Sequence, residues 1–157
     1  MKFLVTKDSK LSPLLRYLIV GVLFAMILYL LLDILLHGYL LGFDINSIKA
    51  TLFGDEENFI EPILFDTLLM QIHINLFFSL IAIMIISSLY IRFYNSYKRT
   101  KIFVHLMLFL GFLSPLLLLI TFLYLPWLLL GFLSIFFTLH ILTSIISILI
   151  LKKLIFR

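Results

Sequence analysis

Residues 14–41 read LLRYLIVGVLFAMILYLLLDILLHGYLL, an apolar run whose only charged side chains are Arg16 and Asp33. A transmembrane helix needs about 20 predominantly apolar residues to cross the hydrocarbon core of a bilayer. The run is too long for the apolar region of a signal peptide, and no small-residue cleavage site follows it. We therefore expect a retained membrane-spanning helix, introduced by Ser12 as its cap and by Pro13.

Three further apolar runs follow, at about 62–91, 102–125 and 128–151. The chain of 157 residues is 64% hydrophobic and 13% charged, whereas a soluble domain usually carries about 45–50% apolar and about 25% charged residues. The runs are continuous, which excludes the alternating strands of a membrane β-barrel. We predict an all-α, polytopic membrane protein in which residues 1–157 form a single transmembrane domain, an up-and-down bundle of four helices.

The longest connection, residues 42–61, combines a helical pattern with acidic residues. Ile45, Ile48, Leu52 and Phe53 recur at helical spacing, and Gly54 follows as a stop signal. This pattern predicts a short amphipathic helix over 44–53, between the first two spans, lying on the outer membrane surface. The charged residues of the connection are one lysine and five acids: Lys49, Asp44, Asp55, Glu56, Glu57 and Glu61.

The basic residues are divided unequally between the two sides of the predicted bundle. Eleven of the twelve lie before the first span, between the second and third, or at the end of the fourth: Lys2, Lys7, Lys10, Arg16, Arg92, Lys98, Arg99, Lys101, Lys152, Lys153 and Arg157. The positive-inside rule places that side in the cytoplasm. We expect a protein of the bacterial inner membrane with both termini cytoplasmic, and no nucleic-acid partner, because the charges flank the spans and form no basic patch.

Polar side chains within the apolar layer are the best pointers to function, because burying them there is costly. They are Asp33, His37, Asp66, Gln71, His73, Asn75, His105 and His140. His37 and His73 each lie roughly 20 residues from the basic residue at the inner end of their span, so both lie about 30 Å from that end at the helical rise. Two histidines at equal depth on different helices suit axial ligation of a haem.

Asp33 precedes His37 by one helical turn, so the two share a face. We therefore predict that His37 and His73 hold a b-type haem, or a metal ion together with Asp33, for electron transfer within a membrane complex. A second set of residues is expected to support this site or to relay protons: Asp33, Asp66, Gln71, Asn75 and His140. His140 also shares a face with Thr143, Ser144 and Ser147, a pattern that favours helix packing.

Two other functions fit the same residues. The first is a cofactor-free accessory or assembly subunit, whose polar residues bind other membrane subunits or a second copy of the chain. The second is a small transport element for protons, ions or solutes, in which His and Asp form a relay. The chain has no cysteine and no hydrolytic or transferase motif, so as an enzyme it would be at most a redox subunit.

Overall fold

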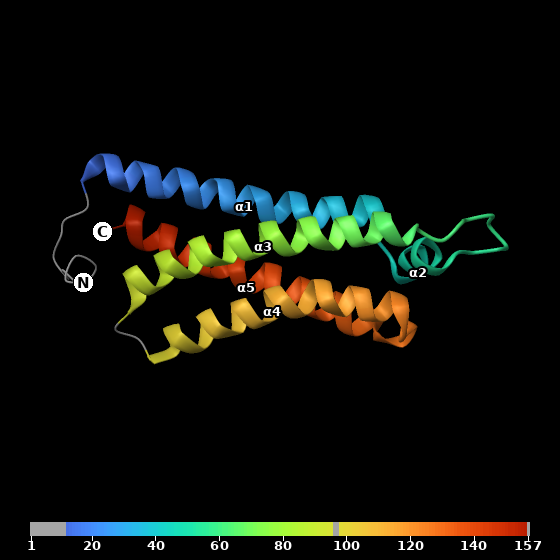
Figure 1. Cartoon of the computed structure of the whole chain (residues 1–157). Coiled ribbons are helices and arrows are strands. Elements are labelled where there is room, and N and C mark those ends of the chain that lie inside the picture. Colours follow the sequence, from blue (N-terminus) through green and yellow to red (C-terminus); the bar gives the residue numbers. More distant parts are fainter. Residues whose placement is uncertain (1–11, 96–97, 157) are drawn as a thin grey trace.

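The protein is described by a computed structural model that covers residues 12–95 and 98–156. The elements follow in the order α1 Pro13–Leu41, α2 Ile45–Phe53, α3 Phe65–Tyr94, α4 Lys98–Leu123, the 3-10 helix η1 Pro126–Leu128 and α5 Leu129–Ile155 (Figure 1). The four long helices are each apolar and long enough to cross a membrane. The predicted four-span all-α architecture is therefore confirmed.

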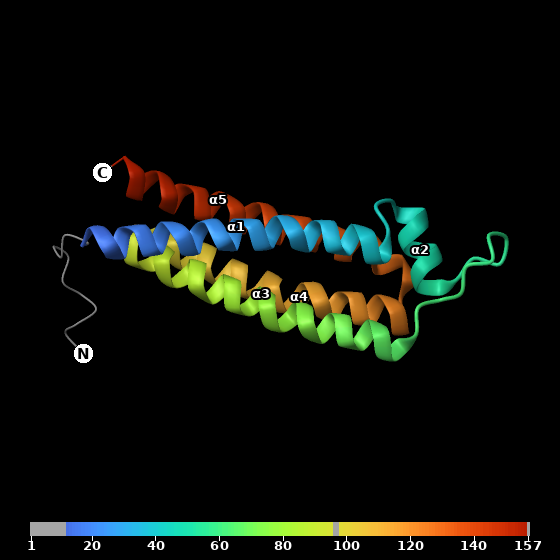
Figure 2. The ribbon, with the colours of Figure 1, turned by 90° about the horizontal axis from the view of Figure 1, so that it is seen from above.

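The four long helices run up and down along one common direction (Figures 1 and 2). The start of α1, the end of α3, the start of α4 and the end of α5 lie together, and we call this the terminal end. The turn between α4 and α5 lies at the opposite end, together with α2, and we call this the loop end. The side chain of Arg16 ties the terminal end together by donating to the carbonyl of Ile155 at 3.0 Å.

The helix bounds differ from the apolar runs by a few residues. α3 begins three residues later than predicted because Pro62 and its neighbours form an extended approach to the helix. α4 begins at Lys98, before its apolar run, and α5 continues to Ile155, beyond its apolar run. Both helices thus include basic residues next to the apolar run, where the membrane interface is expected. α4 continues through Pro115, although a proline inside a helix removes one backbone hydrogen bond.

The short helix predicted between the first two spans is confirmed as α2, and it crosses the loop end of the bundle (Figure 2). Its residues Ile48 and Leu52 are buried. Asp44 caps it by accepting from the backbone N–H groups of Asn46 and Ser47, each at 3.0 Å, and Gly54 ends it. Gly42 makes the turn from α1 to α2 with φ of 121°, a left-handed conformation that favours glycine.

The buried apolar side chains form two clusters, one in each half of the bundle. The cluster of the terminal half includes Leu23, Ile86, Met107 and Ile150. The cluster of the loop half includes Leu41, Leu52, Leu68, Leu118 and Phe132. On each long helix the change from one cluster to the other falls next to the buried polar residues, so these residues form a layer across the bundle between two apolar halves.

Candidate functional site

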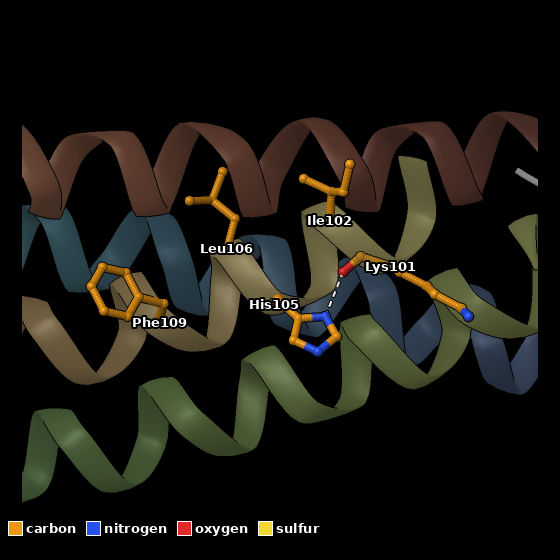
Figure 3. Close-up of a pocket in the computed structure, with 5 residues that line it drawn as sticks. All are labelled: Lys101, Ile102, His105, Leu106 and Phe109. Carbon is orange, nitrogen blue, oxygen red and sulfur yellow. Dashed lines mark hydrogen bonds between the residues drawn. The ribbon is translucent and has the colours of Figure 1, made fainter. Parts of the chain in front are cut away.

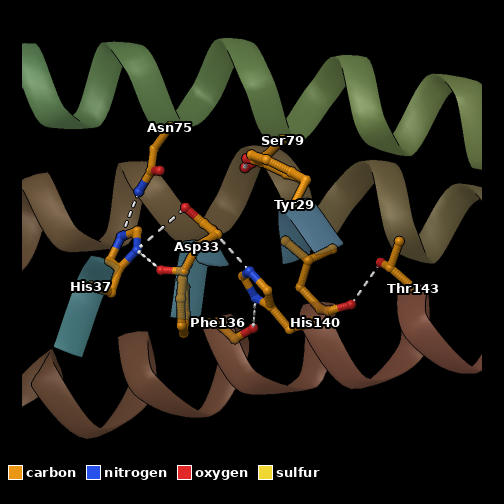
Figure 4. Close-up of polar contacts among 9 residues, drawn as sticks. Tyr29, Asp33, His37, Asn75, Ser79, Phe136, His140 and Thr143 are labelled. Atoms are coloured by element: carbon orange, nitrogen blue, oxygen red, sulfur yellow. Dashed lines mark hydrogen bonds and ion pairs between the residues drawn. The ribbon is translucent and has the colours of Figure 1, made fainter. Parts of the chain in front are cut away.

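The polar layer consists of Asp33 and His37 on α1, Asn75 on α3 and His140 on α5 (Figure 4). The buried Ser114 on α4 completes it. Asp33, His37 and His140 retain only 6%, 6% and 3% of their surface. Charged and imidazole side chains are rarely buried this deeply unless they are paired. The layer therefore has to be explained by the contacts that its members make.

Asp33 and His140 form the central contact between α1 and α5. His140 Nε2 lies 2.9 Å from Asp33 Oδ2, and His140 Nδ1 lies 2.8 Å from the carbonyl oxygen of Phe136. A carbonyl only accepts hydrogen bonds, so Nδ1 of His140 carries a proton. The second ring nitrogen, Nε2, is therefore the one that contacts the Asp33 carboxyl group.

The contact between His140 Nε2 and Asp33 Oδ2 needs one further proton. An imidazole protonated on Nδ1 alone presents a lone pair at Nε2, and a carboxylate also presents lone pairs. The two would repel each other at 2.9 Å. One proton must therefore lie between them, as imidazolium with carboxylate or as imidazole with carboxylic acid, and the pair is neutral only while it holds that proton.

His37 extends the layer toward the loop end. Its Nδ1–H donates to the backbone carbonyl of Asp33 at 2.9 Å and lies 3.5 Å from the Asp33 carboxyl oxygen Oδ1. Its Nε2 then accepts from the side-chain amide of Asn75 on α3. The ring of Phe136 lies against both imidazoles, with centroid distances of 4.5 Å to His37 and 4.2 Å to His140.

Toward the terminal end, the next polar contact is between Tyr29 and Ser79, whose oxygens lie 3.5 Å apart. A cavity of about 10 Å³ adjoins the layer, and its polar lining comes from Asp33, Asn75, Ser79, Ser114 and His140. A space of this size with several polar groups is suited to a single water molecule. All four long helices contribute to its wall, so the layer joins the whole bundle.

The structure brings together four of the residues singled out from sequence and separates the others. Asp33, His37, Asn75 and His140 meet in the polar layer. His73 and Asp66 are exposed on α3, and Asp66 accepts from the backbone N–H of Thr67. His73 and Asn75 are two residues apart, about 200° around the helix, so His73 points away while Asn75 faces His37.

Gln71 is half-buried, and its side-chain nitrogen has no hydrogen-bond partner among the described residues. Within the same part of the chain, no group of three or more His, Asp or Glu side chains is arranged to hold a metal ion. His37 is the described histidine best placed to reach a ligand, because its ring also lines a larger cavity under α2.

His105, the remaining histidine, lies on the exposed face of α4 near the terminal end (Figure 3). Its Nδ1–H donates to the carbonyl of Lys101 at 2.7 Å. The shallow groove beside it is lined by residues of α4 alone, including Ile102 and Phe109. An open face of one helix provides no enclosing wall, so this groove is not a candidate site.

The sequence places His140 among the residues expected to support the site or relay protons, and also favours a role in helix packing, but it does not pair His140 with Asp33. The two residues are 107 positions apart, and on single helices their depths differ by several residues. One signal was available: Asp33 and His140 are the deepest carboxylate and the deepest histidine of the spans.

Comparisons of the chain with protein-family models, with curated proteins and with solved structures found no match. The fold and the composition together characterise the chain as a small four-span integral membrane protein. The polar layer is the feature of the bundle that calls for a chemical function.

Proposed function

We propose that the protein is a proton-binding element of the membrane, in which the Asp33–His140 pair takes up and releases one proton in a transport process. The observation that carries this proposal is that His140 faces two acceptors, the Phe136 carbonyl and the Asp33 carboxyl group. Ionisable residues inside membrane spans commonly mark proton relays and ion pathways. A bundle held only by packing has no need of this pair.

The surroundings of the pair favour an exchange site over an open proton channel. His37 links the pair to the loop end. Toward the terminal end, the hydroxyl groups of Thr143 and Ser147 donate to carbonyls of their own helix, at 2.7 and 2.8 Å. The apolar cluster of the terminal half surrounds them. An interrupted relay of this kind favours slow exchange of protons over free conduction.

The proposal includes an orientation and a location. The terminal end carries Arg16, Arg92, Arg99 and Lys152, and the loop end carries the acidic connection. By the positive-inside rule the terminal end faces the cytoplasm, and the loop end faces the outside of a bacterial inner membrane. The Asp33–His140 pair then lies closer to the outer surface.

The protonation of His140 can be measured directly by nitrogen NMR of histidine-labelled protein in lipid nanodiscs. We expect the wild-type His140 Nε2 signal to be that of a protonated or proton-sharing nitrogen. In Asp33→Asn, the amide can donate to Nε2, so His140 should become a neutral ring with an accepting Nε2. Asp44→Asn makes the same chemical change outside the bundle and should leave the His140 signals unchanged.

Proton movement is the functional readout. In proteoliposomes with a pH-sensitive dye inside and potassium with valinomycin to balance charge, a pH gradient should drive slow proton entry through the wild type and through Asp44→Asn. Asp33→Asn should reduce that entry to the level of empty liposomes. Equal rates for the wild type and Asp33→Asn would remove the basis of the proposal.

The exposed face of α3 supports a second function, membership of a membrane complex. Asp66, Met70 and His73 lie on this face, and Met70 is 61% exposed. Polar groups that face lipid are unfavourable, so this face gains from contact with another subunit or a second copy. Cross-linking from His73→Cys in native membranes should capture a partner, whereas Phe109→Cys on α4 should not.

Haem or metal ligation by His37 and His73 stays a prediction from the sequence. Binding at that pair would require His37 to exchange its contact with Asn75 for the cofactor and His73 to turn inward. An optical spectrum of the purified protein tests it: a Soret band that is lost in His73→Ala and kept in His105→Ala is the expected result of haem ligation.

A further inference from the structure

A cavity of about 260 Å³ lies at the loop end, between α1, α2 and α5. Its polar contributors are His37, in its inner part, and Asp44, at the start of α2. Four phenylalanines also line it: Phe43, Phe132, Phe136 and Phe137. Its volume is somewhat below the range of about 300–1,000 Å³ typical of pockets for drug-sized molecules, so a small ligand fits it.

The wall of the cavity depends on a close approach at Gly38. A Cβ atom at this position would lie 2.1 Å from the ring of Phe43. The ring of Phe43 therefore rests against the bare backbone of α1 while 77% of its surface remains exposed. Phe43 belongs to the short link between α1 and α2, so the link itself supplies one aromatic wall.

The charge around the cavity is negative. Asp44 is held ionised because hydrogen bonds from the hydroxyl and the backbone N–H of Ser47 lower its pKa below the usual 3.8. The rest of the connection adds four more acids against one lysine: Asp55, Glu56, Glu57, Glu61 and Lys49. An anionic headgroup or phosphate is repelled from such a site, and a cation is attracted to it.

The walls favour a cation for a second, independent reason. The faces of aromatic rings carry a negative partial charge, and rings gathered around a pocket recognise ammonium groups. His37 adds an uncharged ring, since Nδ1 donates to Asp33 and Nε2 accepts from Asn75. With both nitrogens engaged, His37 offers no free donor that would hold an anion.

We propose that this cavity binds a small lipophilic cation, an aromatic or alkyl ammonium compound that enters at the loop end. The ammonium group would lie toward Asp44 and the apolar part among the phenylalanines. The inference stands on the cavity and its charge, and so goes beyond the proton exchange proposed for Asp33 and His140. A lipid acyl chain fits the apolar walls but makes no use of Asp44.

Benzyltrimethylammonium is a suitable probe, because neopentylbenzene has the same shape without the charge and phenylacetate carries the opposite charge. Binding is measured by ligand-detected NMR with the full chain in nanodiscs of zwitterionic lipid. We expect the cation to bind, the neutral compound to bind more weakly and the anion not to bind. Asp44→Asn should weaken cation binding by about twofold to fivefold, the size of one exposed ion-pair contribution.

Control variants distinguish binding of the cation inside the cavity from its attraction to the negative charge of the connection. Asparagine is also a good helix cap, so Asp44→Asn retains α2. Asp55→Asn removes an equal charge outside the cavity and should change binding little. Gly38→Ala displaces the ring of Phe43 and should weaken binding of the cation without removing any charge. Asp33→Asn should bind the cation normally, which keeps this test distinct from that of proton exchange.

Three results would overturn the proposal. Equal affinity for the neutral and the cationic compound would identify an apolar cavity for lipid chains. Equal losses in Asp44→Asn and Asp55→Asn would indicate attraction by surface charge alone. Absence of cation binding to the wild type would contradict the proposal directly.

Discussion

Removing one member of the Asp33–His140 pair should cost more stability than the pair as a whole contributes. In His140→Leu, the Asp33 carboxyl group stays buried, with 6% of its surface exposed, and loses the partner at 2.9 Å. In soluble proteins, breaking a buried ion pair in this way costs about 3–5 kcal/mol. Asp33→Leu leaves the neutral His140 Nε2 without a partner, which costs about 1–3 kcal/mol.

The double variant Asp33→Leu/His140→Leu leaves neither group behind, so its loss of stability should be smaller than the sum of the two single losses. Neutral hydrogen bonds between membrane helices give coupling energies of about 0.6 kcal/mol on average and about 1.7 kcal/mol at most. We expect the pair that shares a proton to exceed that range, with a coupling energy of about 2 kcal/mol or more.

The four proteins of this cycle can be compared by equilibrium unfolding in bicelles, with steric trapping as the assay. The double variant also shows whether the bundle folds without the pair, so a failure of one single variant to fold still informs the cycle. A coupling energy near 0.6 kcal/mol would mean an ordinary neutral hydrogen bond and would refute the argument that His140 and Asp33 form an imidazolium–carboxylate pair.

Three further predictions concern packing, topology and the short helix. Gly111→Val should destabilise the bundle by about 1–3 kcal/mol more than Gly21→Val in the same unfolding assay. A Cβ atom at Gly111 would lie 2.4 Å from the side chain of Ile83, whereas a Cβ atom at Gly21 would have nothing within 4 Å. Equal losses of stability would contradict the close packing of α3 and α4. A membrane-impermeant thiol reagent applied to intact cells should label Asn58→Cys and leave Asn95→Cys unlabelled, and the reverse pattern would invert the topology. The lowered pKa of Asp44 means that its cap stabilises α2 fully above the usual value of 3.8 and is lost as the pH falls through the lowered value. The protection factors of the α2 amides, which are exchange rates corrected for the intrinsic effect of pH, should therefore fall below about pH 4 in the wild type and not in Asp44→Asn.

The sequence was sufficient to predict the fold, because each span is a long apolar run and a membrane leaves few alternatives to a helix. The short helix α2 was also predictable, from the spacing of Ile45, Ile48 and Leu52 and from Gly54. Four members of the polar layer were among the eight polar residues singled out from the sequence, because Asp33, His37, Asn75 and His140 stand out against apolar neighbours. The other four lie outside the layer, and Ser114 was not predicted.

The pairing within the polar layer was not predictable from depth. Counting residues gives the height of a side chain along its helix but not the direction in which it points. His37 and His73 share a height, yet Asn75 and not His73 faces His37. The partner of Asp33 came from α5, and that choice depends on how the helices are rotated and tilted against one another.

The position of the polar layer along the bundle determines which solution controls its protonation. On one side His37 separates the Asp33–His140 pair from a cavity that opens at the loop end. On the other side stand the thirteen buried side chains of the terminal-half cluster, including Leu23, Ile86 and Ile150. Under the proposed proton exchange, a proton therefore has a shorter route toward the loop end than through the apolar cluster of the terminal half. At rest, the pair would follow the acidity outside the loop end and remain insulated from the compartment at the terminal end, so that delivery to that compartment requires the helices themselves to move.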